Sequence, residues 1–181
     1  MEKIVIKDKV FKPYIKYERI QEAIDSVAER INADFRGCED VPVLLCVLNG
    51  AILFTGELMQ RLDFTLELVS VKLSSYQGTQ STGTVLNVMG FTGDVRGRRV
   101  IVCEDIIDTG TTIVALKEML LSQGASEVRI CSMLLKPDVY DKDEKIDYVG
   151  MEIPNDFIVG FGLDYDELGR NSRDIYVIDQ E

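Results

Sequence analysis

Three carboxylates and three hydroxyls are concentrated in the run Glu104-Asp-Ile-Ile-Asp-Thr-Gly-Thr-Thr112. It follows directly on the apolar stretch Val100 to Cys103, which is typical of a buried strand. A loop leading from such a strand into a helix offers unpaired backbone N–H groups, and the helix dipole favours an anion there. Gly110 lets the backbone curl close to a phosphate, and the threonine hydroxyls add donors. Since Asp and Thr also favour N-caps, a phosphate loop and an ordinary cap are equal alternatives for residues 108–112 alone.

The preceding pair of acids changes this balance. Glu104 and Asp105 follow Val-Ile-Val-Cys, a position where solvated surface acids are unusual. At the carboxyl end of a strand, two adjacent carboxylates can accept hydrogen bonds from two vicinal hydroxyls or bind Mg²⁺. Together with the phosphate loop, the pair predicts a site for a ribose 5-phosphate.

The composition excludes several classes of function. The chain has 181 residues, 46% of them hydrophobic, and a formal net charge of −11, which argues against nucleic acid or an anionic membrane as the main partner. There is no histidine, so Ser-His-Asp and Cys-His catalysis and the common His-based zinc sites are excluded. Acid–base chemistry must come from carboxylates, lysine, tyrosine or cysteine.

The same features indicate a cytoplasmic protein. No apolar run approaches the length of a membrane span, and the first residues lack the apolar core of a signal peptide. Cys46, Cys103 and Cys131 lie in or beside strand-like runs, and none of the four cysteines forms a C-x-x-C pair. We therefore predict buried, reduced thiols rather than disulfides or metal ligands.

Hydrophobic periodicity indicates the elements that must position these groups. It predicts helices over residues 17–35, 51–62 and 112–123, and strands over 41–48, 64–73, 84–89, 99–103, 128–135, 157–160 and 175–178. The polar, glycine-bearing segment 74–83 is predicted to be a mobile loop. Apolar strands alternating with helices favour an α/β fold with a doubly wound, mainly parallel sheet, and no linker divides residues 1–181. Ligands bind such sheets beyond the carboxyl ends of the strands, where Asn49-Gly50, Glu104-Asp105 and Lys136 are expected.

The run Val100 to Thr112 resembles the phosphoribosyl pyrophosphate signature of the type I phosphoribosyltransferases, and within them it is most similar to the hypoxanthine-guanine enzymes. Six further segments match that family in order, so the resemblance covers most of the chain from Leu45 onward. They are Leu45–Gly50, Leu73–Tyr76, Gln80–Gly83, Leu134–Lys136, Val149–Pro154 and Phe157–Tyr165. Residues 1–41 match too weakly for roles to be assigned.

The resemblance implies a fold and a reaction. The fold is a single domain over residues 1–181, with the parallel sheet flanked by helices and a small hood formed by terminal segments. The reaction transfers the 5-phosphoribosyl group from phosphoribosyl pyrophosphate to N9 of hypoxanthine or guanine, and it forms IMP or GMP and pyrophosphate with Mg²⁺ as cofactor. A homodimer or homotetramer and a cytoplasmic role in purine salvage are also implied.

The resemblance further implies a role for each matching residue. Sugar and metal would be held by Glu104 and Asp105, with Asp164 at a second Mg²⁺, and the 5-phosphate by Asp108, Thr109, Gly110, Thr111 and Thr112. Asp108 would also be the general base facing N7 of the purine. The base would be held by Lys136 at its 6-oxo group, by stacking on Phe157 and by the backbone of Ile158. Pyrophosphate would contact Asn49, Gly50 and Arg170, and Ser75 and Tyr76 would belong to a lid.

The resemblance also includes one departure and one backbone feature. Some relatives carry Lys where this chain has Asn49, so a charged side-chain contact to pyrophosphate is missing, and the backbone N–H groups of Asn49 and Gly50 can serve instead. As in relatives, we expect a cis peptide bond between Leu48 and Asn49.

Three alternatives remain open at this point. The first is another transferase of the same fold: xanthine-preferring enzymes share the acid at position 108, whereas adenine and orotate enzymes usually lack it. A catalytically inactive, nucleotide-sensing regulator of the same fold is the main rival from another class. A dinucleotide oxidoreductase is a poor fit, because no G-x-G-x-x-G follows the first apolar strand.

Overall fold

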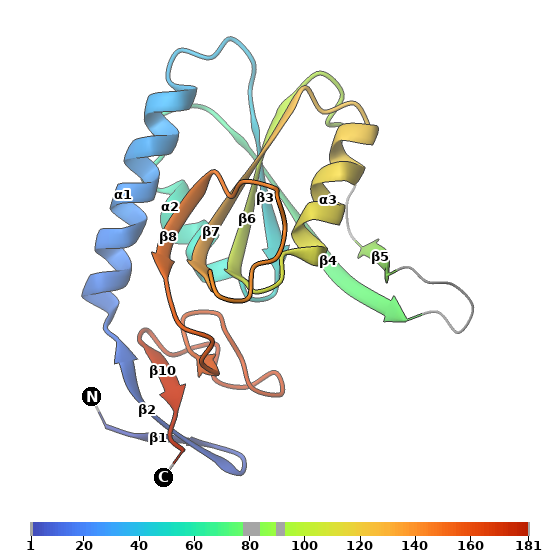
Figure 1. Ribbon diagram of the computed structural model, residues 1–181. Coiled ribbons are helices and arrows are strands. Elements are labelled where there is room, and N and C mark those ends of the chain that lie inside the picture. Colours follow the sequence, from blue (N-terminus) through green and yellow to red (C-terminus); the bar gives the residue numbers. More distant parts are fainter. Residues whose placement is uncertain (1, 78–83, 90–92, 181) are drawn as a thin grey trace.

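A computed structural model describes residues 2–77, 84–89 and 93–180 of the chain, which form two sheets and three helices (Figure 1). The helices are α1 (Tyr17–Phe35), α2 (Ile52–Met59) and α3 (Thr111–Ser122). The strands are β1 (Ile4–Ile6), β2 (Lys9–Ile15), β3 (Val43–Leu48), β4 (Glu67–Gln77), β5 (Thr84–Met89), β6 (Arg99–Ile107), β7 (Glu127–Leu135), β8 (Tyr148–Glu152), β9 (Ile158–Val159) and β10 (Ile175–Ile178).

The main sheet has six strands in the order β5-β4-β3-β6-β7-β8. All neighbouring pairs in it are parallel except β4 with β5, which is antiparallel. The two faces of the sheet are both apolar, since Val100 and Val102 of β6 belong to one core cluster and Ile101 and Cys103 to the other. Helices cover both faces, α1 and α2 on one and α3 on the other (Figure 1). This is the doubly wound, mainly parallel sheet that the sequence predicts.

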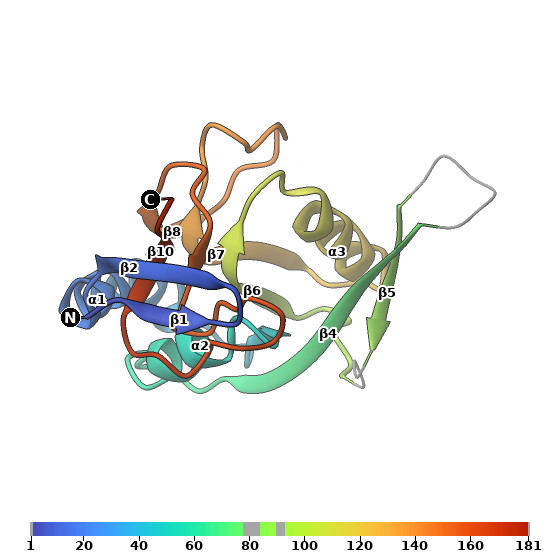
Figure 2. The ribbon, with the colours of Figure 1, turned by 90° about the horizontal axis from the view of Figure 1, so that it is seen from below.

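A second, four-stranded antiparallel sheet lies beyond the carboxyl ends of the main strands (Figures 1 and 2). Its order is β1-β2-β10-β9, so it combines both ends of the chain and confirms the expected hood of terminal segments. Phe11 is fully buried at its centre, among Ile6, Val159 and Tyr176.

Three strands of the structure were not predicted, and their compositions explain why. β1 has only three residues, β2 contains Pro13, and β8 contains Gly150, and both Pro and Gly weaken a strand pattern. Gly150 is required by close packing, because a Cβ there would lie 2.6 Å from the carbonyl oxygen of Met133.

The structure corrects two predicted boundaries that bear on the site. β4 continues to Gln77 instead of ending at residue 73, because its antiparallel pairing with β5 satisfies the backbone groups of residues 74–77. The prediction of a loop is therefore wrong for 74–77, and residues 78–83 lie outside the described part of the chain. β6 continues to Ile107 instead of ending at Cys103, since Glu104, Ile106 and Ile107 remain paired with β7.

The cysteines agree with expectation, whereas α2 is shorter than the predicted helix 51–62 because it ends at Met59. All four cysteines are free thiols, and Cys46, Cys103 and Cys131 are buried in adjacent strands. Burial raises the pKa of Cys46 to about 11. Within the described ranges, no helix is both long and apolar enough to cross a membrane.

The packing of α3 on the sheet yields a test of the fold. Leu116 is fully buried on the inner side of α3, whereas Leu121 of the same helix is 43% exposed. Leu116→Ala should lower the free energy of unfolding by about 2–5 kcal/mol through lost burial and a cavity. The matched Leu121→Ala should change it by no more than about 0.5 kcal/mol. Urea denaturation of both variants measures the difference, and equal losses would contradict this placement of α3.

Candidate active site

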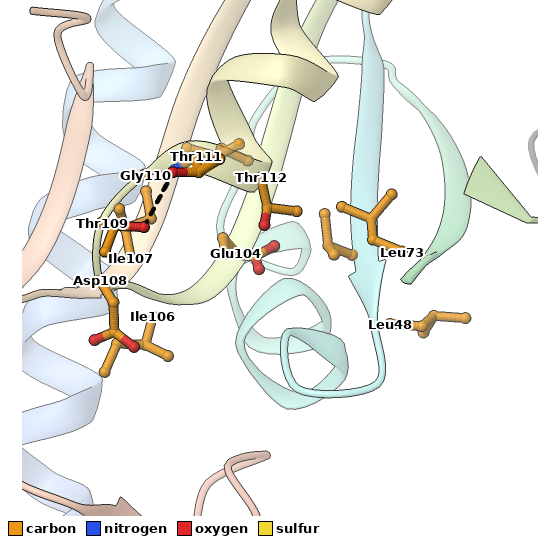
Figure 3. Close-up of a pocket in the computed structure, with 12 residues that line it drawn as sticks. Leu48, Leu73, Glu104, Ile106, Ile107, Asp108, Thr109, Gly110, Thr111 and Thr112 are labelled. Atoms are coloured by element: carbon orange, nitrogen blue, oxygen red, sulfur yellow. Dashed lines mark hydrogen bonds between the residues drawn. The ribbon is translucent and has the colours of Figure 1, made fainter. Parts of the chain in front are cut away.

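A cavity of 340 Å³ opens where β3 and β6 end and α3 begins (Figure 3). Parallel strands end at the same edge of a sheet, so segments far apart in the sequence meet here. The cavity is lined by Val47, Leu48, Leu73, Glu104, Ile106, Ile107, Asp108, Thr109, Gly110, Thr111, Thr112 and Ile113. Glu104 and all five residues of the predicted phosphate loop therefore share one cavity.

The loop before α3 has the geometry of an anion cradle. Gly110 is the N-cap of α3 and adopts a left-handed conformation with φ 76°, which favours glycine. Thr109 Oγ1 lies 3.3 Å from Thr111 Oγ1 at the start of the helix (Figure 3). Because the cap is a glycine, Asp108 is not the N-cap, and the first helical turn keeps N–H groups that no cap side chain satisfies.

Glu104 is a carboxylate held in a crowded, poorly solvated position. Its Oε2 atom is buried and has no hydrogen-bond partner among the described residues. Burial, followed by the neighbouring charge of Asp105, raises the pKa of Glu104 well above its usual range. An unpartnered buried oxygen is costly in the free protein and is suited to a ligand that donates to it.

Asp105 lies against the segment after β3. A Cβ on Gly50 would be 1.6 Å from Asp105 Oδ2, so only glycine at position 50 allows this approach. Asp105 Oδ1 accepts a 2.8 Å hydrogen bond from the backbone N–H of Ile106. Burial raises the pKa of Asp105 to about 6, although that N–H group and Arg170 act to lower it.

Lys136 and Asp108 form an ion pair, which joins β7 to the phosphate loop. Lys136 follows β7 and is only 8% exposed, and its Nζ lies 3.0 Å from Asp108 Oδ1. Its backbone N–H donates to the carbonyl oxygen of Ile107, which fixes the two strand ends side by side. Asp108 keeps half of its side-chain surface exposed, so its carboxylate is accessible from the solvent.

Phe157 and Ile158 lie in the hood and do not line the cavity. The Phe157 ring is 44% exposed, and it packs on Phe11 with ring centroids 6.1 Å apart. Ile158 is buried in β9, where it pairs with Val177 of β10. The hood therefore presents one open aromatic face backed by a buried ring.

Asp164 and Arg170 belong to the loop between β9 and β10. Asp164 Oδ1 lies 2.7 Å from Arg170 Nη2, and its Oδ2 accepts a 2.8 Å hydrogen bond from the N–H of Glu167. The loop packs on the segment after β3, since a Cβ on Gly162 would lie 2.0 Å from the carbonyl oxygen of Gly50. The peptide bond between Leu48 and Asn49 is cis, as expected.

The structure describes only part of the expected lid and does not bring the expected metal ligands into one complete metal site among the described residues. Ser75 and Tyr76 lie in β4, paired with Leu86 and Val85 of β5, and the remainder of the expected lid falls partly on residues that the structure does not describe. Among residues 2–77, 84–89 and 93–180, no group of three or more Cys, Asp or Glu side chains could hold a metal ion by itself.

Two residues at the site were missed by sequence reasoning. Asn155 Oδ1 lies 3.3 Å from Lys136 Nζ and so gives the ammonium a second acceptor. Tyr140 packs on the phosphate loop, since a Cβ on Gly110 would be 2.3 Å from its ring. Neither lies in a regular element or a matching segment, so the sequence offers no signal for them.

Comparison with known proteins agrees with this geometry. The family model of the phosphoribosyl transferase domain matches residues 16–166. The hypoxanthine-guanine phosphoribosyltransferase of Streptococcus thermophilus is 40% identical over 156 residues, which are 86% of each chain. The enzyme of the same name from Streptococcus pneumoniae is 34% identical over 98% of each chain.

A solved structure gives the same result in three dimensions. The crystal structure of a hypoxanthine phosphoribosyltransferase from Staphylococcus aureus superposes with a TM-score of 0.85 and 32% identity. The match covers 93% of this chain and 91% of that one. With a matching family model, relatives above 30% identity and a shared fold, the chain belongs to the type I phosphoribosyltransferase family.

Proposed function

We propose that this protein is a purine salvage enzyme. It transfers the 5-phosphoribosyl group from phosphoribosyl pyrophosphate to N9 of a 6-oxopurine, hypoxanthine or guanine, and forms IMP or GMP and pyrophosphate. One observation carries the proposal: a desolvated carboxylate with an unpartnered oxygen, Glu104, shares a cavity with the anion cradle of residues 108–112. This pairing suits a sugar phosphate, whose hydroxyls donate to the carboxylate while its phosphate accepts from the cradle.

The sugar lies between these two groups in the proposed complex. Glu104 and Asp105 accept hydrogen bonds from the ribose 2- and 3-hydroxyls, and the 5-phosphate accepts from the backbone and hydroxyls of Thr109 to Thr112. Breaking the bond to pyrophosphate builds positive charge on the sugar ring. Carboxylates fixed in advance beside that ring stabilise the charge without reorganisation.

The purine lies on the side of Lys136 and the hood. Lys136 donates to the 6-oxo group, a role that suits an ammonium because it has donors and no acceptor for a 6-amino group. Phe157 stacks on the base with its open face, and the backbone of Ile158 meets the base edge. Asp108, 3.0 Å from Lys136, is within reach of N7 and accepts its proton as the general base.

Mg²⁺ is the cofactor in this proposal, and the donors fit it. Glu104, Asp105 and Asp164 supply hard carboxylate oxygens, and Oε2 of Glu104 is free to bind. The described carboxylates do not form a complete metal site by themselves, and Mg²⁺ commonly completes such a site with water and substrate phosphates. When bound, it neutralises charge on the leaving pyrophosphate.

Two further groups of residues are proposed to contact pyrophosphate and to form a lid. Arg170 and the backbone N–H groups of Asn49 and Gly50 contact pyrophosphate, and the ion pairs with Asp164 and Glu167 hold the Arg170 guanidinium in place. Ser75 and Tyr76 belong to a lid that closes on the bound sugar and excludes water.

We also propose the setting in which the enzyme works. Residues 1–181 act as one domain, because the hood combines both ends of the chain. A homodimer or homotetramer is supported by exposed apolar side chains at Ile52 and Leu53 of α2 and Leu68 of β4. A cytoplasmic location is supported by the four free thiols.

Steady-state assays test the function directly. Phosphoribosyl pyrophosphate is supplied with hypoxanthine, guanine, xanthine or adenine, with and without Mg²⁺. We expect Mg²⁺-dependent release of pyrophosphate with hypoxanthine, guanine or both, and none with adenine. Nucleotide binding without turnover on any purine would favour the inactive regulator instead.

The role of Asp108 is tested by Asp108→Asn. The variant keeps the side chain's shape and can still accept a hydrogen bond from Lys136, but it cannot take up a proton as a carboxylate does. We expect turnover to fall on the order of 10²- to 10⁴-fold, with little change in phosphoribosyl pyrophosphate binding. Calorimetric binding beside steady-state rates measures both quantities.

A double variant, Glu104→Gln with Asp105→Asn, is the control for that experiment. It should weaken sugar and metal binding as well as turnover, because it removes both charges beside the ribose. Near-normal turnover in Asp108→Asn would mean that the proton leaves by another route.

The raised pKa of Asp105 predicts how stability depends on pH. Its folded-state pKa, about 6, exceeds the usual 3.8, so the folded protein holds an extra proton between these values. The protonated form of Asp105 is the one that the folded state favours, so its contribution to stability is lost as the pH rises through 6. In Mg²⁺-free buffer, Asp105→Asn should raise the free energy of unfolding at pH 7.5 by about 1–3 kcal/mol, and less at pH 4.5.

Thermal and urea unfolding at both pH values measure this gain. Asp138→Asn, which removes an exposed carboxylate, is the control and should show no comparable gain. A destabilised Asp105→Asn protein at pH 7.5 would contradict the assigned desolvation of Asp105.

A further inference from the structure

Two tight turns from opposite ends of the chain meet at the hood (Figure 2). One is the turn of the β1–β2 hairpin at Lys7 and Asp8, and the other is the turn at Asp166 and Glu167 between β9 and β10. We infer that the first turn is a latch that positions the loop 164–170, and with it Asp164 and Arg170, for pyrophosphate. This inference rests on the proposed function and gives a role to the N-terminal segment, which the sequence left without one.

Backbone strain is concentrated at this contact. In the described part of the chain, four residues other than glycine have a positive φ: Lys7 at 54°, Phe161 at 48°, Asp166 at 50° and Glu167 at 66°. Three of the four, Lys7, Asp166 and Glu167, lie in the two turns that meet. Left-handed conformations are unfavourable for such residues and persist where the surroundings hold them, often at functional sites.

Side chains connect the two turns directly. Tyr165 Oη donates a 2.8 Å hydrogen bond to Asp8 Oδ1, and Lys7 Nζ lies 2.9 Å from Asp166 Oδ2. Lys9 Nζ lies 5.4 Å from the centre of the Tyr165 ring. Three consecutive residues of the hairpin therefore contact two consecutive residues of the loop.

The contacted turn is rigidly coupled to the site residues. Tyr165 and Leu168 exchange backbone hydrogen bonds of 2.9 and 3.1 Å, which close the turn. Within it, Asp164 Oδ2 accepts from the N–H of Glu167, and Arg170 pairs with both Asp164 and Glu167. Moving the turn therefore moves the proposed metal ligand and the proposed pyrophosphate contact together.

Phe157, which is proposed to stack on the purine, is held in place by contacts that do not depend on the latch. The rings of Phe157 and Tyr165 are perpendicular with centroids 5.8 Å apart, but Phe157 also packs on Phe11, which is fully buried in the hood. Removing only the Tyr165 hydroxyl leaves both ring contacts in place. The latch should thus affect the pyrophosphate side of the reaction and spare the binding of the base.

The test deletes the hydroxyl or its acceptor in the full-length protein. Tyr165→Phe and Asp8→Ala should each raise the KM for phosphoribosyl pyrophosphate about three- to tenfold, the range expected for one hydrogen bond. Calorimetry should show the same loss for pyrophosphate with Mg²⁺. The KM for hypoxanthine should stay within about twofold, since the ring packing is kept.

Three further variants separate positioning from general stability. Asp8→Asn retains an oxygen acceptor and should restore near-normal values. Tyr165→Phe combined with Asp8→Ala should be no worse than either alone, because both break the same bond. Tyr14→Phe removes the hydroxyl of a half-exposed tyrosine on β2 and should leave both KM values unchanged.

Unchanged pyrophosphate affinity in Tyr165→Phe and Asp8→Ala would overturn the latch. So would equal rises in both KM values, or a matching loss in Tyr14→Phe, since each indicates a general effect on the hood. If the wild-type protein turns over no purine while Tyr165→Phe still weakens pyrophosphate binding, the latch stands and the proposed function fails.

Discussion

Desolvation of the two carboxylates near the carboxyl end of β6, Glu104 and Asp105, is the constraint around which this protein is organised. A parallel sheet with helices on both faces requires strands that are apolar throughout, and β6 meets that requirement as far as Cys103. The next two residues are acids that remain in the strand, where burial raises the pKa of both. Nothing in the free protein fully compensates this burial, because Glu104 Oε2 has no partner among the described residues. A fold that keeps such charges at a strand end is prepared for a ligand that donates hydrogen bonds or carries a metal ion.

The surrounding elements hold this edge together through close backbone approaches. The absence of a side chain at Gly50 lets Asp105 approach its backbone, and the absence of one at Gly162 lets the carbonyl of Gly50 approach in turn. As a result, β6, the segment after β3 and the loop after β9 are in direct contact. The ion pair between Lys136 and Asp108 adds β7 to the same assembly. Space requires glycine at both positions, because a side chain at either would collide with an oxygen atom of the site, and at Gly162 the φ of 97° favours glycine as well.

The sequence predicts the parts of this structure that repeat a simple pattern. α1, β5 and β10 have the predicted bounds, because their patterns are regular over the whole element. The cavity also brings together Glu104 and residues 108–112, as the strand–loop–helix pattern indicates. β1, β2 and β8 escaped prediction, since pairing partners far along the chain stabilise short or Pro- and Gly-containing strands. Contacts such as Asn155 with Lys136, or Asp8 with Tyr165, depend on tertiary placement that no local pattern encodes.

The order of strands in the hood has a consequence for how the chain is made. β2 is complete once residue 15 has been synthesised, but only one of its two partners, β1, is then available, because the other is β10 at residues 175–178. The six strands of the main sheet all end by residue 152 and can therefore pair on the ribosome before β10 exists, although Ile158 and Phe161 join one of its core clusters later. Contacts between such distant segments form slowly. We therefore expect the hood to form after the main sheet, so that a chain ending before residue 157 would contain the phosphate loop but lack the Phe157 ring on which a base is proposed to stack.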